Sequence, residues 1–452
     1  MQIDPPASPT SRLPLILIIV ALGLIVTGGV ALIVWQFGQL NAPPKIAATP
    51  TPIDAAAPIA PAPNSSALKR LAVIDGERLY TIDPDGQHQV IIEPRGEVPT
   101  AALIWTRDGQ RLVYAQTVGP DSQLISVNVQ GEDERVLFES DRVKVPFYLN
   151  GAPDDEHIVF LSADTTRGLA MQVAALDQAD SARVVARGQP NYASWSPDGQ
   201  SLLLHVGGAT RDGYIGTYRL GDEQPTPIET SPAEFQAPVW ATADGRIYAR
   251  RGSVDSSLIS QAGNDSKTLA AFSAGITFSG SPDGEYVAYA LNSPDSFLFE
   301  KLTVIKRDGT QAKVIERGDV LAFFWSPDGR YLAHLTGALV SPGPIGRAGG
   351  LAAPRKVAQP RSLQITWHVI DVVTDEHRIL TTFEPNESFL YLIQYFDQFA
   401  QSIAVWSPDS RSLVYTGTPF GGSEGVYVVD TQAADPQAQF VGRGDFASWS
   451  WR

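Results

Sequence analysis

A short motif that recurs along the chain constrains its fold more than any other feature. Copies of Trp-Ser-Pro-Asp-Gly, or close variants of it, begin at Trp105, Trp195, Ser281, Trp325 and Trp406. Weaker copies occur at 152–155 and at Trp240, which is followed by Asp244 and Gly245. Pro sets φ at the first turn corner, Asp caps the turn, and Gly accepts a positive φ without strain. Because apolar or alternating runs flank each copy, each one predicts a β-hairpin.

Two more alternating runs follow most copies, as at 302–305 and 312–315. Each unit is therefore predicted to hold four strands, with its Trp anchoring the first strand against a neighbouring unit. The spacing between copies is roughly 41 to 47 residues, with one gap of about 81, and such a period is typical of a β-propeller. The residues assigned to the structural repeat are Trp105, Asp108, Trp195, Asp198, Trp240, Asp244, Asp283, Trp325, Asp328, Trp406, Asp409 and Trp449.

The two ends of the repeat region complement each other. Three strand-like runs begin at Leu71, Leu79 and Val90 without a first strand before them, while the chain ends on 446–451, a first strand with nothing after it. A closing blade built from both ends would pair edges that are otherwise exposed. We therefore expect an all-β propeller of eight four-stranded blades, or seven if one weak unit is misread.

The Trp-Ser-Pro-Asp-Gly pattern resembles the PD40 (WD40-like) repeat of TolB-type propellers, and the resemblance covers most of the chain after residue 68. It implies a propeller fold, but this repeat serves binding scaffolds, peptidase-associated propellers and lyases alike. The sequence departs from the TolB family by keeping an apolar amino-terminal segment and by lacking the additional amino-terminal α/β domain. The partners of that family are therefore not carried over.

Residues 13–37 are almost wholly apolar and follow a polar tail at 1–12. A helix of about 23 residues spans roughly 35 Å, enough to cross the hydrocarbon layer and long for a signal-peptide core. We therefore expect a transmembrane signal anchor, with a cleaved signal peptide as the alternative. Arg12 precedes this segment, and no Lys or Arg follows it until Lys45, so the N-terminus is expected in the cytoplasm and the rest outside. The Ala- and Pro-rich residues 38–67 predict an extended linker, followed by the propeller domain at 68–452.

Composition excludes several classes of function. The net charge of −15 argues against nucleic-acid binding, which needs concentrated Lys and Arg. Because the chain has no Cys, disulfides, thiol catalysis and Cys-ligated zinc are excluded. The repeat Asp residues lie on different units and are expected to cap turns rather than share an ion. The six His residues show no spacing typical of metal ligands, and we predict neither a metal nor a cofactor.

Two insertions are expected on one face of the ring, because the connections between strands 2 and 3 and between strand 4 and the next blade emerge together. They are 338–362 and 384–401, beside the loop 416–425, and the Pro-Asp-Gly hairpins emerge on the opposite face. Apolar residues at helical spacing predict a short helix in the second insertion. That helix either packs as a cap over the ring or presents a partner surface. The candidate partner-binding residues are Phe389, Tyr391, Tyr395, Phe396 and Phe399.

No catalytic residue is predicted. Residues 421–425 match the Gly-x-Ser-x-Gly elbow of hydrolases, but that elbow needs a later His, and none follows. The sequence therefore favours a membrane-anchored propeller at the cell envelope that binds a protein or ligand without catalysis. Two alternatives stay open: an enzyme of the lyase or hydrolase type with residues lining the channel, and a TolB-like assembly or sensor factor.

Overall fold

The computed structural model describes residues 69–76, 78–141, 144–292, 298–340 and 362–452. Chain contacts divide the protein into two units, 1–47 and 48–452, and all described residues belong to the second. The segments expected to form the cytoplasmic tail, the membrane helix and the linker therefore lie outside the described residues. Within the described part of the chain, no helix is long and apolar enough to cross a membrane.

The described residues form antiparallel sheets. The first joins both ends of the domain and contains β31 Phe446–Trp449, β1 Leu71–Asp75, β2 Arg78–Ile82 and β3 Val90–Ile92. Two four-stranded sheets follow: β4 Leu103–Trp105, β5 Arg111–Val118, β6 Asp121–Asn128 and β7 Arg135–Asp141; then β8 Tyr148–Gly151, β9 His157–Asp164, β10 Gly168–Ala175 and β11 Arg183–Arg187. Two more are β12 Asn191–Trp195, β13 Ser201–Val206, β14 Tyr214–Arg219 and β15 Thr226–Glu229; then β16 Val239–Trp240, β17 Gly245–Arg250, β18 Ser256–Ala262 and β19 Asp265–Phe272.

The remaining strands are joined into one eleven-stranded sheet. Its members are β20 Ile276–Gly280, β21 Tyr286–Asn292, β22 Phe299–Lys306, β23 Lys313–Glu316, β24 Val320–Trp325, β25 Tyr331–Val340, β26 Ser362–Asp371, β27 His377–Pro385, β28 Ser412–Pro419, β29 Gly425–Asp430 and β30 Ala438–Gly442. The link between β22 and β24 is a single pair, Phe299 with Val320. Ahead of β28, Trp406 pairs with Leu413 as an isolated bridge, in the place of a first strand. The large sheet therefore consists of four-stranded groups held by short links.

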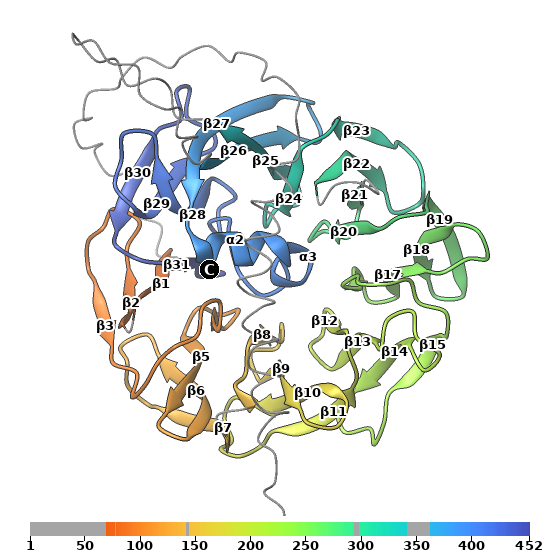
Figure 1. Cartoon of the computed structure of the whole chain (residues 1–452), viewed down its shortest axis with the longest axis horizontal. Helices are drawn as coiled ribbons and strands as arrows, with labels where there is room; N and C mark the ends of the chain where they lie inside the picture. The colour runs from red at the N-terminus through yellow and green to blue at the C-terminus, as the bar shows by residue number, and fades with distance from the viewer. Residues whose placement is uncertain (1–68, 77, 142–143, 293–297, 341–361) are drawn as a thin grey trace, which may run out of the picture. The chain divides into compact units, whose positions relative to one another are not determined.

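The sheets follow one another around a circle in Figure 1, with the short helices α2 Glu387–Gln394 and α3 Phe396–Phe399 inside it. Four Trp residues of the repeat join neighbouring sheets through their indole N–H groups, whereas those of Trp240 and Trp449 have no hydrogen-bond partner among the described residues. The indole Nε1 of Trp195 donates to the carbonyl of Asn150 at 3.0 Å, and that of Trp406 donates to the carbonyl of Phe324 at 3.0 Å. In the same way, the indole Nε1 of Trp105 donates to the carbonyl of Ser448, and that of Trp325 donates to the carbonyl of Ser279. Each acceptor lies on the first strand of the adjoining group, which confirms the predicted anchoring role and the propeller fold.

The predicted closure by both chain ends is also confirmed. Strands β1 and β31 pair antiparallel, with Leu71 opposite Trp449 and Ile74 opposite Phe446. Trp449 is buried, and its main-chain N–H donates to the carbonyl of Ala404 at 2.9 Å, so the last strand also contacts the preceding group. Strand β31 thus pairs with the open edge of β1 and also bonds to Ala404 of the preceding group.

The Asp residues of the repeat cap their turns, as the sequence predicts. In the copy at 195–199, Ser196 Oγ donates to Asp198 Oδ1 at 2.5 Å, and the same oxygen accepts the main-chain N–H of Gln200 at 3.1 Å. Gly199 has a φ of +70°, and a Cβ placed on it would lie 2.7 Å from Cγ of Asp154 on the preceding sheet. Glycine is therefore needed here both for the turn and for close contact between sheets.

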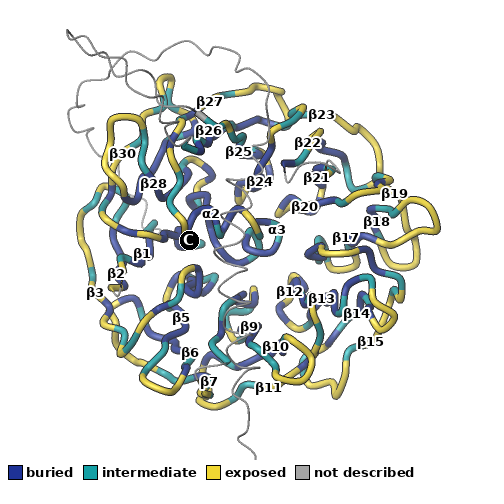
Figure 2. Tube along the Cα trace, viewed as in Figure 1, coloured by how far each residue is buried: buried dark blue, intermediate teal, exposed yellow. Residues whose placement is uncertain are grey.

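Burial follows position in the ring. Figure 2 shows buried inner strands and exposed outer strands and connections. The inner strand β24 is buried throughout, whereas the outer strand β15 is mostly exposed. Strands β25 and β26 extend further than expected, since Ala338 pairs with Gln364 and Val340 with Ser362. The predicted start of the first insertion, at residue 338, is therefore too early, because strand β25 continues to Val340. Residues 341–361 of the insertion lie outside the described residues.

Candidate functional site

The second insertion forms the helix that its apolar spacing predicts. Helix α2 begins at Asn386, whose Oδ1 accepts the main-chain N–H of Phe389 at 2.9 Å, and such a cap satisfies a donor that the first turn leaves free. Asn386 is fixed in turn by Thr416, whose hydroxyl donates to the same oxygen at 2.9 Å. The helix is thereby positioned against β28, at the inner edge of the ring.

Three of the five candidate partner-binding residues are buried. Phe389, Phe396 and Phe399 are each less than 5% exposed. Phe396 is surrounded by aromatic rings, with its centroid 4.7 Å from that of Phe323 and 5.9 Å from that of Phe324. Phe399 contacts Tyr148, across the ring on β8, at 5.8 Å. In this structure these three side chains hold the insertion in the ring.

The two tyrosines of the candidate set are only partly buried. The rings of Tyr391 and Tyr395 contact each other at 5.4 Å, and that of Tyr391 also contacts Phe399 at 5.7 Å. Burial raises the pKa of Tyr391 to about 12, so its hydroxyl stays protonated at neutral pH. Within the predicted set, the surface open to a partner therefore consists of Tyr391 and Tyr395.

Polar contacts attach the insertion to several other sheets. Asp397 Oδ2 accepts the main-chain N–H of Ala237, ahead of β16, at 3.3 Å. Arg107, in the turn after β4, donates to the carbonyl of Gln401 at 2.7 Å and stacks over the ring of Trp451 at 3.7 Å. Tyr148 donates to the carbonyl of Gln398 at 3.3 Å. We call residues 386–401 the plug, because this segment crosses the ring interior (Figure 1).

Enclosure by the plug changes the ionisation of two groups. Burial raises the pKa of Asp397 to about 6, and the hydrogen bonds from main-chain N–H groups only partly oppose this shift. Burial also lowers the pKa of Arg107 to about 10, although Asp155 counteracts it. A carboxyl group and a guanidinium are thus held inside the ring without a direct ion pair between them in the described structure. The raised pKa of Asp397 brings the change in its charge close to neutral pH.

Large apolar side chains are exposed on the connections of the plug-bearing face. Phe235 lies between β15 and β16, Val254 between β17 and β18, and Phe420 between β28 and β29, with exposed fractions of 67%, 88% and 80%. All three connections join strand 4 to the next first strand or strand 2 to strand 3, the same connection types as the two insertions. The sequence does not reveal this set, because exposure of an isolated apolar residue in a loop depends on the folded neighbours.

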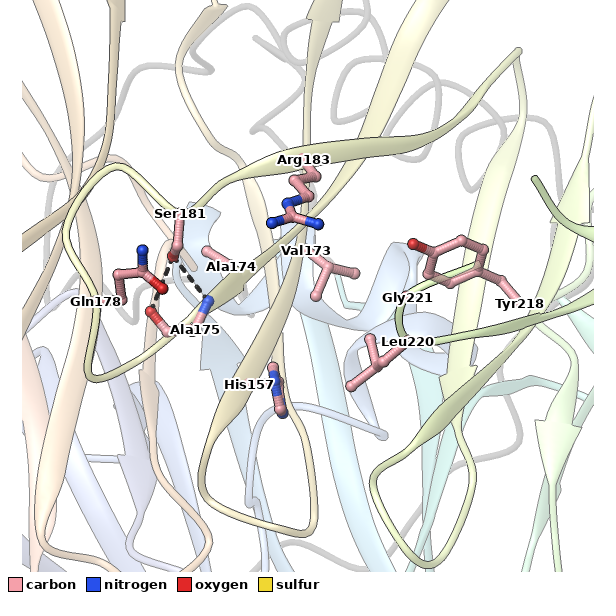
Figure 3. A pocket seen from close by; sticks show the side chains of 10 residues that line it. All are labelled: His157, Val173, Ala174, Ala175, Gln178, Ser181, Arg183, Tyr218, Leu220 and Gly221. Atoms are coloured by element: carbon pink, nitrogen blue, oxygen red, sulfur yellow. Dashed lines mark hydrogen bonds between the residues drawn. The ribbon is translucent and has the colours of Figure 1, made fainter. Parts of the chain in front are cut away.

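A first cavity, of about 240 Å³, lies between β10 and β14 (Figure 3). Its lining includes His157, Arg183 and Tyr218, which come from different strands. His157 Nδ1 lies 2.9 Å from Asp154 Oδ2, and Glu156 completes a group with ligand atoms within 4.8 Å of one another. Asp154 already accepts the main-chain N–H of Glu156 as the turn cap of a weak repeat copy. This group therefore fits a capped turn, and no metal is assigned to it.

A second cavity, of about 310 Å³, lies on the plug-bearing face between the β23–β24 connection and strands β25 and β26. Its lining residues are Glu316, Arg317, Gly318, Asp319, Thr336, Gly337, Ala338, Thr366 and His368. Behind Glu316, the buried His334 stacks on His368 with ring centroids 4.8 Å apart. The linear spacing of the His residues gives no hint of this cluster, because cross-strand register in β25 and β26 creates it.

No family model matches the chain, and no curated protein matches it. Several solved β-propeller structures are similar to it. TolB from Acinetobacter baumannii is 18% identical, with a TM-score of 0.34, over 56% of this chain and 65% of TolB, just under two thirds. An oligogalacturonate lyase from Vibrio parahaemolyticus is 13% identical, with a TM-score of 0.42, over 80% of this chain and 98% of the lyase.

The β-propeller domain of the trilobed protease from Pyrococcus furiosus is 10% identical, with a TM-score of 0.39, over 67% of this chain and 86% of that domain. These proteins differ in what their names say they do. The strand pairing of the chain itself establishes its fold. The protein is a β-propeller, and TolB is among the propeller proteins to which it is similar.

Proposed function

We propose that the protein is an eight-bladed propeller, anchored in the cell membrane by residues 13–37, that binds a protein partner outside the cytoplasm and catalyses no reaction. The plug-bearing face is the binding surface. The blade number rests on the strand groups: those from β4 to β30 form seven successive groups among the described residues, and the sheet of β31, β1, β2 and β3 adds the eighth. The bridge at Trp406 supplies the first strand of the group that contains β28.

The exposed apolar side chains on the plug-bearing face carry this proposal. Phe235, Val254 and Phe420 extend from three separate connections, while Tyr391 and Tyr395 lie on the plug between them. Aromatic residues are enriched at protein-binding surfaces, and four of these five residues are aromatic. The described part of the ring interior is occupied by the plug, which favours binding on the face over chemistry in an open channel.

Site-specific photo-crosslinking in native membranes tests the binding face. A crosslinking residue at position 420 or 235 should capture a partner, whereas one at position 373 should not. Val373 is a matched control, because it is 71% exposed but lies between β26 and β27, a connection of the opposite face. Phe235→Ser combined with Phe420→Ser should abolish co-purification of the captured protein, and Val373→Ser should leave it unchanged. Equal capture from both faces would contradict the proposal.

Protease treatment of intact cells tests the proposed location. If residues 13–37 anchor the chain with the propeller outside, added protease should remove the domain from the outer side of the membrane. The same treatment after permeabilisation serves as the control for intrinsic resistance of the folded ring. A domain that is digested only after permeabilisation would place it in the cytoplasm.

A further inference from the structure

The second cavity has the chemistry of a site for a positively charged group. Glu316 and Asp319 contribute two carboxyl groups to its lining, while Arg317 is the one basic side chain among the lining residues. The main-chain N–H of Arg317 donates to Glu316 Oε1 at 2.8 Å, which leaves Oε2 directed toward His334. Thr336 and Thr366 add hydroxyl groups. The cavity is thus polar and rich in hydrogen-bond acceptors.

The imidazoles at this cavity carry no positive charge at neutral pH. Burial lowers the pKa of His334 and lowers that of His368 to about 4, and the neighbouring imidazole lowers the pKa of His368 further. The close contact with His334 and the hydrogen bond from the main-chain N–H of Arg317 lower the pKa of Glu316 to about 2, so this carboxylate stays ionised. A neutral imidazole offers one nitrogen as an acceptor. The lining therefore presents two carboxyl groups, hydroxyl groups and an uncharged imidazole, and Arg317 is its one permanently charged basic side chain.

One buried side chain behind the cavity lacks partners. His334 is 1% exposed, and neither of its ring nitrogens has a hydrogen-bond partner. Its Nε2 lies 3.6 Å from Glu316 Oε2, which is too long for a hydrogen bond. His368, by contrast, is paired through Nε2 with Thr336 Oγ1 at 2.9 Å. Buried polar atoms are usually paired, and the unpaired Nε2 atom of His334 faces the Glu316 carboxylate that lines the cavity.

We infer that this cavity binds a ligand bearing a guanidinium or ammonium group, with the cation held by the carboxyl groups of Glu316 and Asp319 and hydrogen-bonded to the Thr336 hydroxyl. A guanidinium fits best, because its several N–H donors can reach a carboxylate and a neighbouring acceptor together. Two sources share this chemistry: a free organic cation, and a basic side chain of a protein partner. The site does not depend on the proposed scaffold function.

Isothermal titration of the full-length protein in detergent near neutral pH tests the site with three probes. Acetyl-arginine-amide represents a basic side chain, and agmatine represents a free organic cation. Acetyl-citrulline-amide has nearly the same shape as the arginine probe but an uncharged ureido group. We expect the two cations to bind and the citrulline probe to bind at least tenfold more weakly. Tighter binding of agmatine indicates a free cation, and tighter binding of the arginine probe indicates a protein side chain.

Variants assign the binding to this cavity. Glu316→Gln removes the charge at nearly constant shape and should weaken cation binding at least tenfold. Glu424→Gln is the matched control, since Glu424 is exposed on the same face between β28 and β29. This variant should bind the cations as tightly as the parent does. If Glu316→Gln fails to fold, Asp319→Asn should still weaken binding severalfold. Absence of binding by both cations, equal binding of citrulline, or unchanged affinity in a folded variant would each overturn the inference.

Discussion

At the scale of single residues, the repeat motif is a device for joining neighbouring sheets as well as for turning the chain. In four copies the Trp indole donates to a main-chain carbonyl of the adjoining group. In several copies the motif glycine also lies close to the preceding group. At Gly284, a Cβ would lie 2.4 Å from Thr242 Cγ2 of the preceding group, and at Gly329 it would lie 2.9 Å from Asp283 Cγ. The same five residues therefore specify the hairpin and the packing between hairpins.

Gly199→Ala tests this double role. The substitution adds the strain of a positive φ, about 1 kcal/mol, to a steric clash with Asp154, and together they should destabilise the protein by about 2–4 kcal/mol. Gly263→Ala is the control, because Gly263 has a φ of +56° and no atom near the added Cβ, so it should cost about 1 kcal/mol. Urea denaturation of both variants measures the difference. Equal losses would mean that the clash between sheets is relieved without cost.

At the scale of elements, the plug carries a carboxyl group that makes stability depend on pH. Burial raises the pKa of Asp397 to about 6, above its ordinary value of 3.8. The folded state therefore binds this proton more tightly than the unfolded state does. The resulting stabilisation is fully present below pH 3.8, declines as the pH rises, and is lost above about pH 6.

Asp397→Asn should remove this dependence. The amide oxygen can still accept the main-chain N–H of Ala237, but it carries no charge to bury. Above pH 6, the variant should be more stable than the parent by an amount on the order of 2 kcal/mol, and the gap should narrow toward pH 4. Melting curves across this range measure it. A constant gap at every pH would show that Asp397 is not the titrating group.

The elements also mark the limit of what the sequence predicts. The helix in the plug is predictable, because Phe389, Leu392, Ile393 and Phe396 fall at helical spacing and Asn386 is a good cap. The position of the helix inside the ring is not predictable from the sequence. The residues around Asp397 do not specify its contact with Ala237, which lies 160 residues earlier in the chain. The cavity beside His334 is not predictable either, because its lining combines the end of one four-stranded group with the middle strands of the next. Repeat spacing predicts the blades, whereas contacts between blades depend on the closed ring.

At the scale of the whole molecule, closure of the ring depends on the last strand. Strand β31 pairs with β1 along its length, and the buried Trp449 contacts the preceding group through Ala404. No other described strand pairs with the free edge of β1. The closing sheet should therefore control the cooperative unfolding of the domain.

Deletion of residues 446–452 should abolish cooperative unfolding or lower the melting temperature by more than 10 °C, on the order expected from losing several kcal/mol in a large domain. Deletion of residues 451–452 alone is the control, since it leaves β31 intact and removes the stacking of Trp451 on Arg107, its apolar packing and the hydrogen bond from Ser450 to Arg452. Calorimetry of both truncated proteins compares them. A full deletion that melts as the parent does would exclude a ring sealed by its own ends.

The composite sheet has a consequence for biosynthesis. The ribosome makes β1 near the beginning of the domain and β31 near its end. The edge of β1 that pairs with β31 therefore stays unpaired while most of the domain is translated. Any product released early keeps two unpaired edges, which invite aggregation and proteolysis. The ring can therefore close only after the residues of β31 have been made.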